Sequence, residues 1–193
     1  MARLCVVGAQ PNNRCAVLRV DFSRLRFLVV EDNLHMRRIV RTLLHGFGSR
    51  DVFEADDGAS GLEAFMHHGP DIITDWMMPI FDGLELTSMI RQPNAKPNPC
   101  VPIIMLTGCT ENKNVMKARE AGVTEFLAKP FSAKGLYTRI LNIVMNQRPY
   151  INSNHYFGPE RRRTRGINYT GPERRTREAQ VIVPPSLAEK VPI

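Results

Sequence analysis

The chain has 193 residues, 43% of them hydrophobic, and a formal net charge of +7. This length fits one domain of ordinary size with additional sequence, and four cysteines without a CxxC pair indicate a reduced cytoplasmic protein rather than a disulfide scaffold or a zinc site. No stretch approaches the ~20 apolar residues of a membrane span, and the apolar N-terminus is broken too early, by Gly8 and Pro11, for a signal peptide.

The positive charge lies at the two ends of the chain. Residues 25–147 carry 13 Lys and Arg against 14 Asp and Glu, residues 148–193 carry 9 against 4, and residues 1–24 carry 4 against 1. This asymmetry divides the chain into an N-terminal extension, a central domain and a basic C-terminal tail with these boundaries. Basic ends of this kind favour contact with anionic partners.

Strands and helices are expected to alternate along the central domain. Short apolar runs bounded by turn residues predict strands, and apolar residues at helical spacing predict helices. In chain order we expect strand 25–30, helix 34–46, strand 51–55, helix 58–68, strand 71–75, helix 83–91, strand 101–106, helix 112–121, strand 123–128 and helix 133–147. Five strands that alternate with five helices predict an α/β fold with a doubly wound parallel sheet.

Two segments fall outside this alternation. Residues 92–102 contain four prolines, cannot form a regular element and make a loop longer than the fold requires. Residues 1–23 show no sustained period and are expected to be loosely ordered. Residues 181–185 are compatible with a short strand or a docking segment.

Polar side chains end four of the five predicted strands. Glu31 and Asp32 follow the first strand, Asp75 ends the third, Thr107 follows the fourth and Lys129 follows the fifth. Because ligands bind beyond the carboxyl ends of the strands in open α/β sheets, we expect these side chains to converge. Clustered carboxylates need a hard cation or an ammonium group, which suits Mg²⁺. Asp75 is then a candidate nucleophile that forms an aspartyl phosphate.

These positions, with Met78-Pro79, Asp82-Gly83 and Pro130, resemble the receiver domain of bacterial response regulators, which is similar to CheY. The resemblance covers about residues 25–147 and implies a flavodoxin-like strand order, a cis Lys129-Pro130 bond, and a histidine kinase or phosphotransfer protein as partner. The site residues that it implies are Asp75 as phosphoacceptor, Asp32, Asp75 and the Met77 carbonyl as Mg²⁺ ligands with Glu31 acting through water, Thr107 and Lys129 on the phosphoryl group, and Phe126 as the switch aromatic.

Each of these positions alone has a simpler explanation. A single aspartate at a strand end is more often a helix cap, and a single lysine is more often a solvated surface group. The joint order of five separated positions favours the site. The histidines have neither metal spacing nor a neighbouring nucleophile, so neither a histidine kinase nor a hydrolase is expected.

The tail contains an internal repeat. The motif Tyr-x-Gly-Pro-Glu-Arg-Arg occupies residues 156–162 and recurs thirteen residues later at 169–175, and seven arginines but no lysine lie between Gly158 and Gln180. Gly-Pro is expected to open a turn, and the scarcity of aliphatic residues from Asn152 to Gln180 predicts that this segment is disordered until it binds a ligand.

Arginine forks match the guanine edge and phosphate, and a glutamate can accept from the guanine N–H donors. Two copies indicate a ligand with two equivalent halves. The tail resembles that of a subgroup of CheY-like proteins that bind cyclic di-GMP, which implies action at the flagellar motor switch or a surface-attachment system. The candidate ligand-binding residues are Tyr156, Glu160, Arg161, Arg162, Tyr169, Glu173, Arg174 and Arg175.

Two other interpretations remain open. A basic tail can adhere to RNA, DNA or anionic lipid through charge alone, although charge alone has no use for a fixed Gly-Pro-Glu before each arginine pair. The chain can also be a phosphate sink in which Asp75 accepts and sheds phosphate and the tail is incidental. We favour a non-enzymatic regulator that acts through a protein partner.

Overall fold

The computed structural model describes residues 21–75, 78, 82–108, 112–161 and 179–187, without the side chains of residues 72–75 and 112. Within them the chain forms, in order, β1 (Arg26–Val30), α1 (Leu34–Gly46), β2 (Asp51–Ala55), α2 (Gly58–His68), β3 (Asp71–Asp75), α3 (Gly83–Ile90), β4 (Ile103–Thr107), α4 (Asn112–Ala121), β5 (Glu125–Ala128), α5 (Ala133–Met145), β6 (Tyr150–Ser153), β7 (Tyr156–Pro159) and β8 (Gln180–Ile182). None of the described helices is long and apolar enough to cross a membrane.

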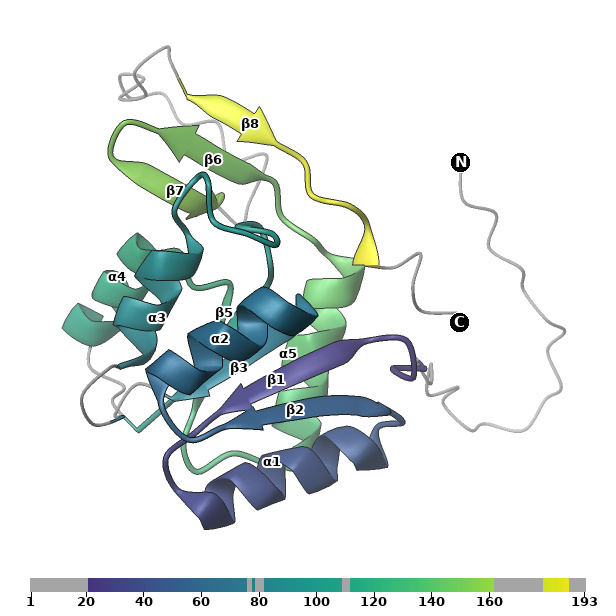
Figure 1. Ribbon diagram of the computed structural model, residues 1–193. Helices are drawn as coiled ribbons and strands as arrows, with labels where there is room; N and C mark the ends of the chain where they lie inside the picture. The colour runs from purple at the N-terminus through teal and green to yellow at the C-terminus, as the bar shows by residue number, and fades with distance from the viewer. Residues whose placement is uncertain (1–20, 76–77, 79–81, 109–111, 162–178, 188–193) are drawn as a thin grey trace, which may run out of the picture.

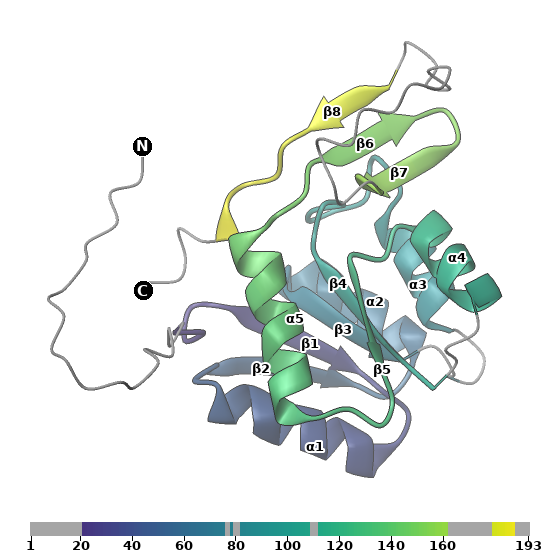
Figure 2. The same ribbon diagram turned by 180° about the vertical axis from the view of Figure 1, so that it is seen from behind.

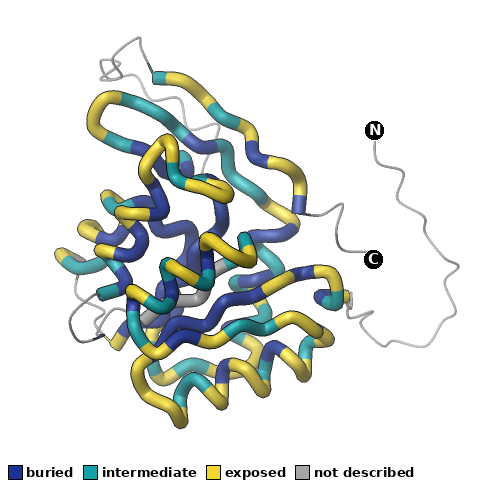
Figure 3. Tube along the Cα trace, viewed as in Figure 1, coloured by how far each residue is buried: buried dark blue, intermediate teal, exposed yellow. Residues whose placement is uncertain are grey.

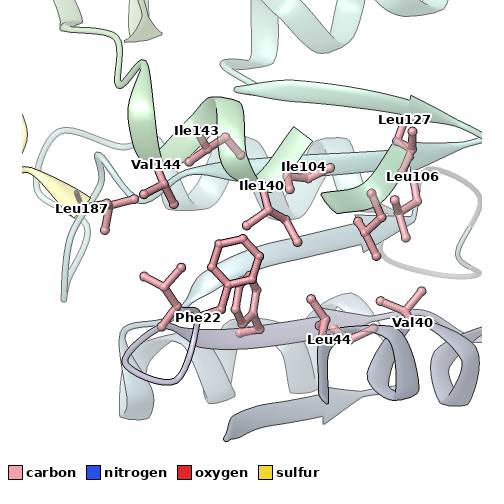
Figure 4. Packing of buried hydrophobic residues seen from close by; sticks show 14 residues of the cluster. Phe22, Val40, Leu44, Ile104, Leu106, Leu127, Ile140, Ile143, Val144 and Leu187 are labelled. Atoms are coloured by element: carbon pink, nitrogen blue, oxygen red, sulfur yellow. The ribbon is translucent and has the colours of Figure 1, made fainter. Parts of the chain in front are cut away.

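The first five strands form one parallel sheet in the order β2-β1-β3-β4-β5, which is the implied flavodoxin-like order. Helices α1 and α5 cover one face, and α2, α3 and α4 cover the other (Figures 1 and 2). Successive residues of a strand point to opposite faces. Accordingly Phe27 and Val29 pack with α1 and α5, while Leu28 and Val30 pack with α2 and α3. Figure 4 shows labelled members of the first cluster, among them Leu44 of α1 and Ile140 of α5.

The helices begin at side chains that cap their first turns. Asn33 accepts hydrogen bonds from the backbone N–H groups of His35 and Met36, and Asp82 forms a capping box with Glu85. These bonds satisfy N–H groups that have no partner within the helix. The predicted helix starts are therefore confirmed. The fourth strand begins at Ile103 rather than at residue 101, and the fifth at Glu125 rather than at residue 123.

The domain starts earlier than predicted. Phe22 is fully buried and its ring lies within 6.5 Å of those of Phe27, Phe47 and Tyr137, measured between ring centroids. The N-terminal boundary at residue 25 was therefore wrong by a few residues, because one aromatic side chain gives no periodic signal. Residues 1–20 lie outside the described part of the chain.

The C-terminal tail forms a second, antiparallel sheet in the order β7-β6-β8. The disorder predicted for residues 152–180 is therefore wrong for the strand residues 152–153, 156–159 and 180, while residues 162–178 lie outside the described part. The tail has few aliphatic residues, but Tyr150 and Phe157 bury themselves against Cys100 of the proline-rich loop. Figure 3 shows buried segments in both sheets. Apolar surface from the central domain thus substitutes for a core within the tail.

Arg91 connects the proline-rich loop to both sheets. Its buried guanidinium donates hydrogen bonds to the carbonyls of Gly122 at 2.9 Å, Pro99 at 2.6 Å and Val101 at 2.7 Å. Its Cζ atom also lies 5.2 Å from the centroid of the Tyr150 ring. Burial lowers the pKa of Arg91, and the three carbonyls supply acceptors that replace water. The long loop is therefore a platform for the tail.

The end of the tail returns to the main core. Leu187 is buried in the cluster between α1 and α5 (Figure 4), and its backbone N–H donates to the Gln147 side chain at 3.1 Å. The possible strand at residues 181–185 is confirmed in part as β8.

Candidate functional site

The carboxyl ends of β1, β4 and β5 are joined at one edge of the main sheet. Lys129 Nζ lies 2.7 Å from Glu31 Oε2, and the Lys129 backbone N–H donates to the Thr107 carbonyl at 2.8 Å. Glu31 directly follows β1, and its own N–H donates to the Ala55 carbonyl of β2. The strand registers place Asp75 opposite Leu106 and Thr107 opposite Ala128, so β3 ends at the same edge.

Among the described residues, the ion pair between Glu31 and Lys129 contributes to the electrostatics of this edge. The Glu31 side chain is 2% exposed, whereas that of Lys129 is 19% exposed. A carboxylate withdrawn from water needs a cation or several donors to remain ionised. Arg37 adds positive charge nearby, because its guanidinium donates to the Glu31 carbonyl at 2.6 Å. The edge therefore holds an anionic group against fixed cations while remaining open to solvent.

The structure brings some of the predicted site residues together. Glu31 and Lys129 are in contact, and Asp32 is exposed next to Glu31. Thr107 is buried and pairs in the strand register with Ala128, the residue before Lys129. The Asp75 side chain and the whole of Met77 lie outside the described residues. The implied cis bond between Lys129 and Pro130 is confirmed.

The donor chemistry of the edge fits Mg²⁺, because Glu31 and Asp32 place two adjacent carboxylates at the end of one strand. Among the described residues no group of three His, Cys, Asp or Glu side chains could hold a metal ion. Two members of the implied set, Asp75 and Met77, fall outside that search. The complete set of metal ligands therefore stays a prediction.

A second feature lies where the tail meets the central domain. A pocket of about 320 Å³ opens between α4, β5 and β7. The described residues that line it are Val115, Arg119, Val123, Thr124, Phe126, Arg148, Tyr156, Pro159 and Arg161. It contains the predicted switch aromatic Phe126 and the predicted ligand residues Tyr156 and Arg161. Sequence reasoning missed Arg119 and Arg148, since neither belongs to a motif.

The first copy of the tail motif is a compact unit. The Tyr156 hydroxyl donates to the Pro159 carbonyl at 2.8 Å, and the Arg161 Cζ atom lies 4.1 Å from the centroid of the Tyr156 ring. Glu160 follows β7 directly, and its backbone N–H donates to the Pro149 carbonyl at 2.8 Å. The remaining predicted tail residues, Arg162, Tyr169, Glu173, Arg174 and Arg175, lie outside the described part.

Two arginines outside the repeated motif hold this unit in place. Arg148 donates to the Glu160 carbonyl at 3.0 Å and also to the Thr124 carbonyl. Arg119 of α4 donates to the Arg161 carbonyl at 3.0 Å. The tail is thereby fixed to the start of β5 and to α4.

The prediction that Gly-Pro opens a turn is wrong for the first copy. Gly158 and Pro159 belong to β7 and pair with Ile151 and Tyr150. A Cβ atom on Gly158 would lie 2.9 Å from the Gly122 Cα atom, closer than such atoms approach. The glycine therefore permits close approach of β7 to the end of α4, which is a packing reason for this part of the motif.

Comparisons with known proteins cover the central domain. The model of the response regulator receiver domain family matches residues 27–141. Chemotaxis protein CheY-3 of Vibrio cholerae is 33% identical over 119 residues, which cover 61% of this chain and 90% of that protein. The β6-β7-β8 sheet lies beyond the matched residues.

Solved structures agree with the fold. Chemotaxis protein CheY4 of Vibrio cholerae aligns with a TM-score of 0.58 and 28% identity, covering 62% of this chain and 98% of that chain. The receiver domain of sensor histidine kinase PA1611 from Pseudomonas aeruginosa aligns with a TM-score of 0.54 and 32% identity, covering 61% and 94%. That structure has a magnesium ion coordinated in its active-site cleft.

Proposed function

Since this chain belongs to the response regulator receiver domain family and is a signalling regulator of the CheY type, we propose that it accepts a phosphoryl group on Asp75. The observation that supports this proposal is the contact between Glu31 and Lys129 at the carboxyl edge of the sheet, where β3 also ends at Asp75. This edge offers an oxygen-rich site with an ammonium group at the end of the sheet where the strand that carries the proposed nucleophile also ends.

Each residue at the edge has a proposed task. A carboxylate oxygen of Asp75 attacks the phosphorus of a phosphorylated histidine on a histidine kinase or phosphotransfer protein, so that an O–P bond forms as the P–N bond breaks and the imidazole leaves. Thr107 donates a hydrogen bond to the phosphoryl group and Lys129 neutralises part of its charge. Asp32, Asp75 and the Met77 carbonyl would hold Mg²⁺, with Glu31 acting through water, and the ion would neutralise part of the charge on the phosphoryl oxygens.

Labelling with a small phosphodonor tests this proposal. Acetyl phosphate with Mg²⁺ should label the wild-type chain, and Asp75→Asn should abolish the label. Asp71→Asn is the matched control, because Asp71 lies at the opposite end of the same strand. The proposal fails if Asp75→Asn is labelled as efficiently as the control, with both chains shown by circular dichroism to be folded.

We further propose that the tail binds cyclic di-GMP and that the ligand-bound chain engages a protein partner at the flagellar motor switch or a surface-attachment system. The doubled Glu-Arg-Arg motif and the arginines around the pocket support this proposal. One argument for a specific ligand was the fixed Gly-Pro-Glu before each arginine pair. The first glycine no longer supports it, because Gly158 is needed for the close contact with Gly122. Arg161 is the member of the two arginine pairs that lies among the described residues, and its guanidinium stacks on the Tyr156 ring.

Calorimetry separates the possible ligands. The intact chain should bind cyclic di-GMP, and a double charge reversal, Arg161→Glu with Arg174→Glu, should abolish binding. Equal binding by both chains would exclude the tail as the site. Tight, strongly salt-dependent binding of a random oligonucleotide, without preference for the dinucleotide, would favour nucleic acid instead.

The proposed regulator has no enzymatic output, and its signal passes through protein contact. A phosphate sink is the alternative in which the tail is incidental. In a sink, Asp75→Asn abolishes both labelling and phenotype, whereas charge reversal in the tail has no effect on phenotype. Loss of the phenotype after the double charge reversal at Arg161 and Arg174, with phosphorylation of Asp75 unchanged, would therefore argue against the phosphate sink.

A further inference from the structure

Three guanidinium groups from three separate segments line the pocket between α4, β5 and β7. Arg119 comes from α4, Arg148 from the connection between α5 and β6, and Arg161 from the residue pair after β7. No carboxylate is among the described lining residues, and the ion pairs of the described residues do not include Arg119 or Arg161. Like charges gathered in this way repel one another, so an anion would relieve the repulsion.

The three arginines differ in what they can offer a ligand. Arg148 already donates to two backbone carbonyls and fixes the tail to β5. Arg119 uses one N–H on the Arg161 carbonyl, and Arg161 stacks on the Tyr156 ring. A guanidinium carries five N–H donors, so Arg119 and Arg161 retain donors for a phosphate. In Figure 2, β7 lies beside the end of α4 that carries Arg119.

The size and walls of the pocket indicate the kind of anion. A volume of about 320 Å³ is at the lower end of the range for small-molecule sites, roughly 300–1,000 Å³, and fits one nucleotide unit better than a whole cyclic dinucleotide. Val115, Val123 and Phe126 supply apolar walls for a base or sugar. A simple inorganic anion would need no such walls.

We infer that this pocket is the subsite for one phosphorylated guanosine half of the dinucleotide, with Arg119 of the central domain contacting the phosphate beside Arg161 of the tail. This inference rests on the proposed binding of cyclic di-GMP and adds a residue outside the repeated motif to the site. The ligand then bridges α4 and the tail. The other guanosine half remains for the second copy of the motif.

Calorimetric titration of the full-length chain with cyclic di-GMP tests the inference. Arg119→Gln should weaken binding about tenfold or more, because it removes a charge-assisted contact. Val115→Trp should weaken binding to a similar extent by filling the pocket without changing the charge. Lys117→Gln removes the same charge from an exposed site on the same helix, outside the described lining, and should leave the affinity within about twofold.

The outcomes separate this inference from the function on which it rests. Normal binding by both Arg119→Gln and Val115→Trp, with loss only on charge reversal at Arg161 and Arg174, overturns the subsite and leaves the proposed ligand intact. Failure of the wild-type chain to bind overturns both. An equal loss in Lys117→Gln and Arg119→Gln shows attraction by net charge and also overturns the subsite. Arg119→Gln also removes the hydrogen bond to the Arg161 carbonyl that holds the tail. Val115→Trp leaves that bond in place and therefore tests the pocket independently.

Discussion

Lys129 determines the electrostatic balance of the carboxyl edge, because it is the cation seen in contact with the buried Glu31 carboxylate. Its partial exposure lets it remain hydrated while it pairs. A charge held in this way is available to a newly formed anion at the same edge without a large movement of the chain. Its removal should take this cation away from the Glu31 carboxylate, which lies in a poorly hydrated place.

Lys129→Met should therefore lower the free energy of unfolding by about 3 kcal/mol in the absence of divalent cations. Adding Glu31→Gln to this variant should restore most of that loss, because the uncompensated charge is removed as well. Urea unfolding of the wild type, the two single variants and the double variant gives the coupling free energy between Glu31 and Lys129. A double variant no more stable than Lys129→Met would contradict the account.

Gly158 has a close-packing role that a substitution can test. Gly158→Ala places a Cβ atom against the backbone of Gly122, and we expect a loss of about 1–3 kcal/mol. Gly46→Ala is the matched control, because a Cβ atom there meets nothing within 4 Å. Thermal unfolding of both variants makes the comparison, and equal melting temperatures would rule out the close contact.

Sequence patterns identified the residues at the edge better than the residues of the pocket. Glu31 and Lys129 end buried strands, and the ends of parallel strands must meet at one edge, so their contact was predictable. Arg119 is one of several charged residues on α4 and carries no periodic or motif signal. Its place in the pocket depends on where β7 docks, which only tertiary contacts determine.

At the scale of elements, the proline-rich loop and β6 share a small buried cluster. Burial raises the pKa of the Tyr150 hydroxyl and of the Cys100 thiol, and the nearby Arg91 guanidinium partly opposes both shifts. The neutral forms of both groups are therefore favoured in the folded chain.

The sign of the pH dependence follows from these raised pKa values. The stabilisation is fully present below the ordinary pKa values of 9.0 for the thiol and 10.0 for the phenol, and is lost as the pH rises past them. Cys100→Ala should reduce the loss of stability between pH 9 and pH 10. Urea unfolding across this range measures the slope, and an identical slope in wild type and variant would contradict the prediction.

The elements that the sequence predicted well are those whose own residues carry the pattern. The strands of the main sheet and α1 to α5 have apolar residues at the right spacing and clear caps, such as Asn33 and Asp82. Strands β6 and β7 have four residues each, and their buried faces pack on Cys100, about 50 residues away in the chain. Such short strands depend on a distant partner, so local patterns could not predict them.

At the scale of the whole molecule, the tail is attached at both of its described ends. A chain that stops at residue 178 loses β8 and Leu187, whereas a chain that stops at residue 187 keeps both. The shorter chain should be less stable by about 2 kcal/mol or more, which is the value of burying one leucine. Chemical unfolding of the two truncated chains checks this prediction. Equal stability would show that β8 and the burial of Leu187 contribute nothing to the free energy of unfolding.

The pairing of β6 on both sides has a consequence for how the two motif copies act together. Tyr150 pairs with Pro159 of β7 on one side and with Ile182 of β8 on the other, so the two strands that precede and follow the repeated motif are held roughly 10 Å apart. Two binding motifs that are linked in this way meet a shared ligand at an effective concentration on the order of millimolar. If the proposed function holds, a ligand on the first Glu-Arg-Arg would meet the second copy within the same molecule, so engagement of the second copy would not depend on the concentration of the protein.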